Sequence, residues 1–127
     1  FYNCTGLSSV SFPACTSIGG YAFQNCTGLS SVSFPVCTSI GGYAFSSCTS
    51  LTSADFPVCT YIGGYAFYNC SNLQSLILRG SSVATIDRNI LDSCPLVSVY
   101  VPASLVDMYK SATNWAWYGN RITSIAE

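Results

Sequence analysis

The chain repeats itself every 22 residues, and this repeat constrains its fold more than any other feature of the sequence. The block Cys4-Thr5-Gly6-Leu7 returns in similar form at residues 26–29, 48–51 and 70–73. Phe-Pro pairs at residues 12–13, 34–35 and 56–57 keep the same spacing. A unit of 22 residues cannot bury its own apolar face, so the units must stack side by side and share one continuous core.

A fifth, degenerate unit follows the regular ones. Cys94 lies 24 residues after Cys70, and the two extra residues fall at 79–82, which predicts a surface-loop insertion. Here Asp87-Arg88 replace the Gly-Gly pair, and Arg79 replaces the proline. The positions that we expect in the core of this unit are Ile86, Ile90, Leu91, Cys94, Leu96, Val99 and Val101.

The first half of each unit has the pattern of a β-strand. Val10 and Phe12 alternate with serines, as in an extended strand with one buried face, and Pro13 ends the strand because it has no N–H for the ladder. Copies stacked side by side would form a parallel sheet with strands about 4.8 Å apart.

The second half of each unit turns the chain back. We expect Gly19 and Gly20 to adopt backbone angles that are closed to other residues. Residues 21–25 are too few for more than one helical turn, so we predict a short turn or 3₁₀ segment that directs Ala22 and Phe23 inward.

The full frame is Leu-x-x-Val-x-Phe-Pro-x-Cys-x-x-Ile-Gly-Gly-Tyr-Ala-Phe-x-x-Cys, and it resembles the BspA-type leucine-rich repeat of bacterial surface proteins. The resemblance covers residues 1 to about 102, although Cys stands between Pro and Ile where an aliphatic residue is commoner. It implies a β-rich α/β leucine-rich-repeat solenoid, with a parallel β-sheet of one short strand per repeat and short turns or 3₁₀ segments opposite. It also implies extracellular display at the cell surface, adhesion to a host or neighbouring-cell protein or glycan, and no catalytic residues.

Residues 1–102 are therefore predicted to form a repeat array, and residues 103–127 a helical C-terminal cap. Ser104 followed by Asp107 predicts a helix N-cap with an acidic first turn. We expect both Trp115 and Trp117 to cover the last unit rather than to bind carbohydrate. The apolar face of the predicted helix is formed by Leu105, Met108, Tyr109 and Ala112.

The N-terminal end carries no such cap. Residues 1–4 align with residues 67–70, so the chain begins in mid-repeat and reads as a truncated array of about four and a half units. We expect its first unit to expose core residues and an open strand edge, and to favour self-association.

Composition excludes several classes of protein. Charged residues make up 7% of the chain and the net charge is −1, which leaves no basic surface for nucleic acid. No apolar run approaches the ~20 residues of a membrane span. There is no His, no phosphate-binding glycine loop and no nucleophile elbow, so an enzyme is disfavoured and no cofactor is implied. The neighbouring charges Asp87, Arg88 and Asp92 are read as a structural salt bridge.

The eight cysteines fall into two columns, one at residues 4, 26, 48, 70 and 94 and the other at 15, 37 and 59. A residue type repeated at one position of every unit is a packing choice, and free Cys behaves as a small hydrophobe. We therefore favour free buried thiols. Disulfides are the second alternative, and a metal site is the weakest because there is neither His nor Cys-x-x-Cys.

Candidate binding residues are those that alternate with the core on each strand. One column holds serines at residues 9, 31, 53, 75 and 98, and its neighbour is Ser11, Ser33, Asp55, Ile77 and Tyr100. We predict a ligand-binding face at the C-terminal side of these columns, and the alternative is a solvated ladder of small residues. Its members are Ser53, Asp55, Ser75, Ile77, Ser98 and Tyr100.

A second candidate is an aromatic column of Tyr21, Tyr43 and Tyr65, continued by Asn89. Stacked tyrosines could hold a sugar or a peptide, or could instead cover the glycine turns with their hydroxyls in water. The sequence thus favours a non-catalytic adhesion module of a longer surface protein. A structural spacer or fibre segment without a ligand of its own is the alternative.

Overall fold

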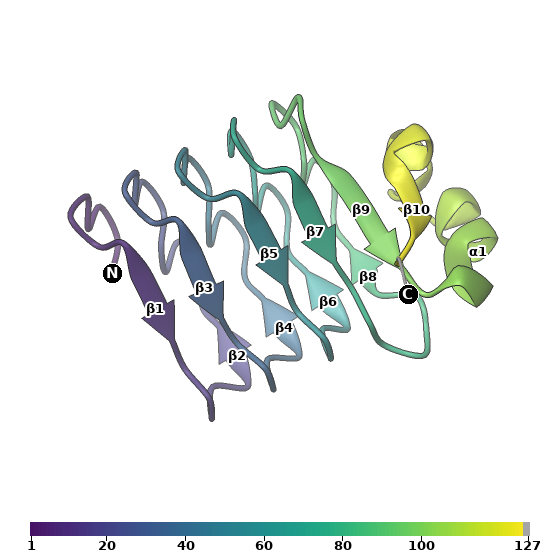
Figure 1. The fold of residues 1–127 in the computed structure, drawn as a ribbon, viewed down its shortest axis with the longest axis horizontal. Helices are drawn as coiled ribbons and strands as arrows, with labels where there is room; N and C mark the ends of the chain where they lie inside the picture. The colour runs from purple at the N-terminus through teal and green to yellow at the C-terminus, as the bar shows by residue number, and fades with distance from the viewer. Residues whose placement is uncertain (126–127) are drawn as a thin grey trace.

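Each repeat forms one turn of a solenoid, and five turns stack between the N-terminus and the helical C-terminal region (Figure 1). The structure, a computed structural model, describes residues 1–125. Every turn adds one parallel strand to the front of the solenoid. β1 pairs with β3, and β5, β7 and β9 pair in order in a second ladder, while within residues 1–125 no ladder pairing joins β3 to β5. We call these five strands together the front sheet. These strands are β1 (Ser9–Ser11), β3 (Ser31–Ser33), β5 (Ser53–Asp55), β7 (Ser75–Ile77) and β9 (Ser98–Val101).

The pairing within the front sheet follows the repeat. Ser9 lies beside Ser31, Ser53 beside Ser75, and Ser75 beside Ser98. The fold class predicted from the sequence, a β-rich leucine-rich-repeat solenoid with one such strand per turn, is confirmed. Because the register is set by the repeat, residues that share a repeat position lie in one column on the surface.

A second parallel sheet forms where the sequence predicted only a turn. Its strands contain two residues each, and they are β2 (Ser17–Ile18), β4 (Ser39–Ile40), β6 (Tyr61–Ile62) and β8 (Thr85–Ile86). The isoleucine of each strand is buried, and the residue before it faces outward to a greater extent. The opposite side of the first four turns is thus joined by a second ladder, and the residues that follow each of its strands form hydrogen-bonded turns.

The Gly-Gly pair serves a different purpose from the predicted one. None of the glycines in residues 1–125 has a positive φ; the left-handed residue is the tyrosine that follows, with φ of 62° at Tyr21 and 58° at Tyr43. Glycine is needed because successive turns approach closely. A Cβ atom on Gly41 would lie 2.5 Å from the backbone nitrogen of Gly20, a distance that real side chains do not tolerate.

Two phenylalanine ladders fill the core between the sheets. One is stacked from Phe23 to Phe45 and Phe67, with ring centroids 5.3 Å apart and planes within 6°. The other, from Phe34 to Phe56, meets the first edge-on, as Phe34 does with Phe45 at 6.3 Å and 74°. Such aromatic pairs contribute roughly 0.5–1.5 kcal/mol each beyond the area they bury. The predicted inward direction of Phe23 is confirmed.

All eight cysteines are free thiols, and six of them are buried. In the first column, from Cys26 onward, the thiol donates a hydrogen bond to a phenylalanine carbonyl of the preceding turn, as Cys48 does to Phe23 at 3.2 Å and Cys70 to Phe45 at 3.1 Å. In the second column the thiol bonds within its own turn, as Cys59 does to the carbonyl of Tyr61. Burial raises the pKa of Cys48 to about 12 and that of Cys59 to about 11.

The fifth turn keeps the core pattern with one shift. Leu96 is 56% exposed, and Val97 is buried in its place. The reason is a change in spacing: β9 begins four residues after Cys94, whereas β7 begins five residues after Cys70. The expectation that Leu96 is a core residue is therefore wrong.

The C-terminal region covers the last turn (Figure 1). It contains the 3₁₀ turn η1 (Ala103–Leu105), the helix α1 (Val106–Ser111), the 3₁₀ segment η2 (Ala116–Arg121) and the strand β10 (Ile122–Ser124), which pairs with β9. The predicted N-cap at Ser104 is wrong. The helix begins after Leu105 without a side-chain cap, because the preceding residues form the 3₁₀ turn.

Two aromatic residues anchor this cap. Trp115 is fully buried and donates from Nε1 to the carbonyl of Ala84 at 2.7 Å, and the Tyr109 hydroxyl accepts from the Ala84 N–H at 2.9 Å. Capping by Trp115 is confirmed. Met108 and Trp117 are 58% and 85% exposed, so the expectation that they pack on the core is wrong.

Candidate functional site

The front sheet brings the predicted binding residues together. Asp55, Ile77 and Tyr100 occupy the same position on the neighbouring strands β5, β7 and β9, and all three side chains are half-buried. The serines at 53, 75 and 98 form the adjacent column on the same three strands. The six predicted residues therefore form one surface, which we call the front face.

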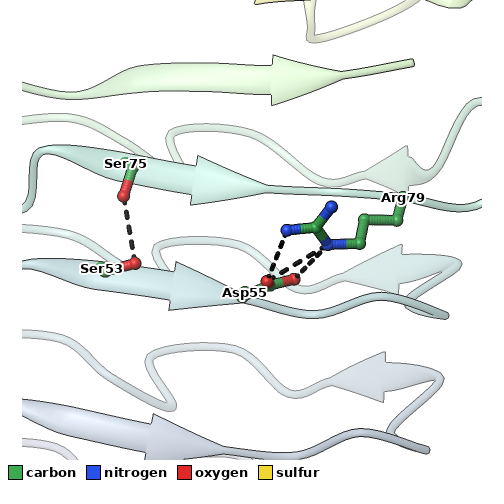
Figure 2. Close-up of polar contacts among 4 residues, drawn as sticks. All are labelled: Ser53, Asp55, Ser75 and Arg79. Atoms are coloured by element: carbon green, nitrogen blue, oxygen red, sulfur yellow. Dashed lines mark hydrogen bonds and ion pairs between the residues drawn. The ribbon is translucent and has the colours of Figure 1, made fainter. Parts of the chain in front are cut away.

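Much of the hydrogen-bonding capacity of the front face is satisfied internally. Figure 2 shows that the Ser75 hydroxyl lies 3.1 Å from the Ser53 hydroxyl. It also shows the Arg79 guanidinium against the Asp55 carboxylate, with Nε 3.2 Å from both oxygens and Nη2 3.0 Å from one of them. These hydrogen bonds, followed by the charge of Asp55, raise the pKa of Arg79.

Arg79 borders the front face and is not among the residues predicted from the sequence. The sequence places Arg79 in an insertion, yet its side chain reaches one turn back to Asp55. The available signal was that Arg79 replaces the proline that follows the strand in other units. Both side chains are more than 40% exposed, so the ion pair contributes little to stability but fixes where the carboxylate lies.

A shallow hollow of about 230 Å³ adjoins Asp55 at the ends of β3 and β5. Its other lining residues are Val32, Ser33, Phe34, Pro35 and Pro57. This hollow thus places two prolines and an apolar floor next to the Asp55 carboxylate.

The expected ion pair at Asp87, Arg88 and Asp92 does not form within residues 1–125. Asp87 accepts a hydrogen bond from the backbone N–H of Arg88 at 2.8 Å, and Asp92 accepts one from the Tyr118 hydroxyl at 2.8 Å. The expectation is wrong because the cap supplies a partner for Asp92. Burial, and then the bond to Asp92, raise the pKa of Tyr118 well above its ordinary value.

The tyrosine column is a continuous stack. The rings of Tyr21 and Tyr43 are 5.0 Å apart and within 2° of parallel, and those of Tyr43 and Tyr65 are 5.0 Å apart and within 9°. Asn89 extends the column by donating from Nδ2 to the Tyr65 hydroxyl at 2.8 Å. Because the rings cover one another's faces, a ligand could contact only hydroxyls and ring edges along most of the column.

The N-terminal turn leaves apolar side chains open to solvent. Phe1 is 59% exposed and Tyr2 is 56% exposed, and Phe1 stacks on Phe23 at 5.4 Å. An apolar hollow of about 170 Å³ lies beside Phe12 and Ile18. Self-association through this turn stays a prediction.

Within residues 1–125, no three His, Cys, Asp or Glu side chains gather in a way that could hold a metal ion. Over the same residues, none of the helices has the length and apolar character needed to cross a bilayer.

Stacked turns, parallel strand ladders on two sides and an aromatic core define the class: the chain is a leucine-rich-repeat solenoid. A family model described as "BspA type Leucine rich repeat region (6 copies)" matches residues 1–116, so the chain belongs to the BspA-type leucine-rich-repeat family. The match extends past residue 102 into the predicted cap. Proteins of this family are generally non-catalytic repeat modules that offer interaction surfaces, and in bacteria they are typically associated with the cell surface.

The chain is also similar to a solved structure, the crystal structure of a leucine-rich repeat protein from Bacteroides ovatus ATCC 8483. The two are 30% identical with a TM-score of 0.76, over 99% of this chain and 32% of the other. The chain thus spans about a third of the length of that protein. No curated protein matches it.

Proposed function

We propose that the chain is a non-catalytic adhesion module, displayed outside the cell as part of a longer surface protein, and that it binds a partner protein through the front face. The observation that carries the proposal is the alignment of Asp55, Ile77 and Tyr100 on three adjacent strands of an otherwise serine-rich sheet. An aromatic residue beside an aliphatic one and a fixed charge is a composition typical of interface anchors.

Three further features support this use of the front face. The hollow beside Asp55 gives a partner side chain somewhere to insert. The guanidinium of Arg79 holds the carboxylate in place before binding, which lowers the entropy lost in the complex. The three strands that carry the front face form one parallel ladder, and solenoids use such extended surfaces for binding.

The alternative is a structural spacer without a ligand of its own. It is favoured by the internal satisfaction of the same surface, since Ser75 bonds to Ser53 and Arg79 to Asp55. A surface whose polar groups are paired with each other has less to offer a partner.

The experiment is a binding screen of the chain against immobilised extracellular-matrix proteins and host-cell surface proteins. The variant Asp55→Ala/Ile77→Ala/Tyr100→Ala is compared with a control, Tyr61→Ala/Thr85→Ala, which changes exposed residues of the second sheet. We expect a hit that the triple variant weakens about 30-fold or more, since truncating an aromatic anchor costs ~2 kcal/mol or more. The control should bind as the unchanged chain does. A screen without hits favours the spacer, and a hit that the triple variant leaves unchanged excludes the front face.

A further inference from the structure

The cap presents one large aromatic side chain to solvent. Trp117 is 85% exposed, so both faces of its indole are open, whereas Trp115 two residues earlier is fully buried. A single exposed apolar side chain is ordinary in itself. Trp117 differs from the other exposed apolar residues in what surrounds it.

Trp117 lines three adjoining hollows, with volumes of about 720, 390 and 320 Å³. The walls come mainly from the turn of the fifth repeat, the loop before η2, and η2 itself. Their hydrogen-bonding side chains include Arg88, Asn89, Asp92, Asn114, Tyr118 and Arg121.

Most of these polar groups are already oriented by bonds within the protein. Nδ2 of Asn89 donates to the Tyr65 hydroxyl, and Nδ2 of Asn114 donates to the carbonyl of Ile86 at 3.0 Å. Nη1 of Arg121 donates to the carbonyl of Cys94 at 2.8 Å.

Each of these bonds leaves another polar atom of the same side chain free. Within residues 1–125 the Oδ1 atoms of Asn89 and Asn114 have no hydrogen-bond partner, and neither have Oδ2 of Asp92 and Nη2 of Arg121. The site thus combines an open aromatic platform with acceptors and donors whose positions are fixed in advance, which lowers the entropy that binding would cost.

The chemistry of the site restricts its ligand. A pyranose ring has an apolar face of C–H groups that stacks on an indole, and a rim of hydroxyls that both donate and accept hydrogen bonds. Two arginines and two aspartates, Asp87 and Asp92, lie in or beside the hollows, so the local charge is balanced and does not select an anion. From this geometry we propose that Trp117 and the polar groups around it bind a neutral hexopyranose unit of a glycan.

This site is separate from the front face. It is formed by the back turn of the fifth repeat and by the cap, and it shares no residue with the front face. The tyrosine column reaches its border through Asn89, but the stacked rings there leave few faces open.

The test is titration of the chain with cellohexaose, maltohexaose, mannohexaose and a β-1,3-glucan hexaose, followed by calorimetry and by tryptophan fluorescence. Since Trp115 is buried, Trp117 is the solvent-exposed emitter, and stacking on a sugar should shift its emission to the blue. We expect at least one hexaose to bind, and Trp117→Ala to weaken it about tenfold or more, equivalent to ~1.4 kcal/mol.

Met108→Ala is the matched control, because Met108 is an exposed apolar residue of the same cap. It should leave sugar binding unchanged, as should the front-face triple variant, so that the two proposals succeed or fail separately. A thermal melt of Trp117→Ala should match that of the unchanged chain, since the side chain packs on little. The proposal is overturned if none of the hexaoses binds at millimolar concentration, or if Trp117→Ala binds as well as the unchanged chain.

Discussion

Gly41 and Gly19 occupy the same position in consecutive repeats but face different surroundings, and this difference makes a sharp prediction. A Cβ atom on Gly41 would lie 2.5 Å from the nitrogen and 2.9 Å from the Cα of Gly20, and 2.7 Å from the carbonyl carbon of Gly19. All three are backbone atoms, which cannot rotate away. A Cβ atom on Gly19 would meet nothing within 4 Å.

We predict that Gly41→Ala destabilises the chain by about 3 kcal/mol, the upper end of the usual range for overpacking, because whole turns must separate to admit the methyl group. For a chain of this length that lowers Tm by roughly 10 °C. Gly19→Ala should be neutral or stabilise by up to ~1 kcal/mol, because alanine restricts the unfolded chain and φ at this position is not positive.

The assay is a pair of thermal melts followed by far-ultraviolet circular dichroism, with denaturant titration as a second measurement. Gly63→Ala provides a repeat of the experiment one turn further on, since its Cβ would lie 2.5 Å from the nitrogen of Gly42. Equal melting temperatures for Gly41→Ala and Gly19→Ala would refute the reasoning.

Two further predictions concern the cysteines. Alkylation in denaturant without reductant should add eight groups to the chain. In the native chain Cys4 and Cys15 should react first, and the six buried thiols should react only after unfolding. Fewer than eight adducts in denaturant would show that disulfides had formed. The free energy of unfolding should fall as pH rises above 9, because the pKa of Cys48 is raised to about 12 and that of Cys59 to about 11 from the ordinary 9.0. This stabilisation is complete below pH 9 and is lost as pH approaches the folded-state values, by ~1.4 kcal/mol per pH unit for each thiol. Denaturant titrations at pH 8, 9 and 10 measure it, and a Cys48→Ala variant whose slope is as steep as that of the unchanged chain would contradict it.

The front sheet could be predicted from the sequence because, in a solenoid, residues that are one repeat apart in sequence lie side by side in space. A residue 22 positions ahead is the neighbour on the next strand, so the column containing Asp55 and Ile77 follows from counting. The second sheet could not be found in this way. Strands of two residues, such as Ser17–Ile18, are too short to show an alternation.

Other contacts could not be predicted because they lie where the repeat is broken. Arg79 lies 24 residues after Asp55, within the insertion, so counting by 22 does not pair them. Trp115 and Trp117 are two residues apart in a segment without any period. Only the packing of the cap, where Nε1 of Trp115 reaches the carbonyl of Ala84, decides which ring is buried.

The difference between positions that repeat in every turn and positions that do not also indicates where binding residues lie. A residue type that recurs in every turn, such as the cysteine at 48 and 70, is explained by its contacts with the turns on either side. At some positions the residue type differs from that in the other repeats, so contacts between stacked turns do not require one particular type there. Asp55, Tyr100 and Asn89 are such positions. Eight of the nine charges lie from Arg79 onward, in the part of the chain where the copies diverge and the cap begins. Both proposed surfaces therefore draw on the end of the solenoid that is freest to vary, while the uniform turns before it supply the rigid scaffold that holds them.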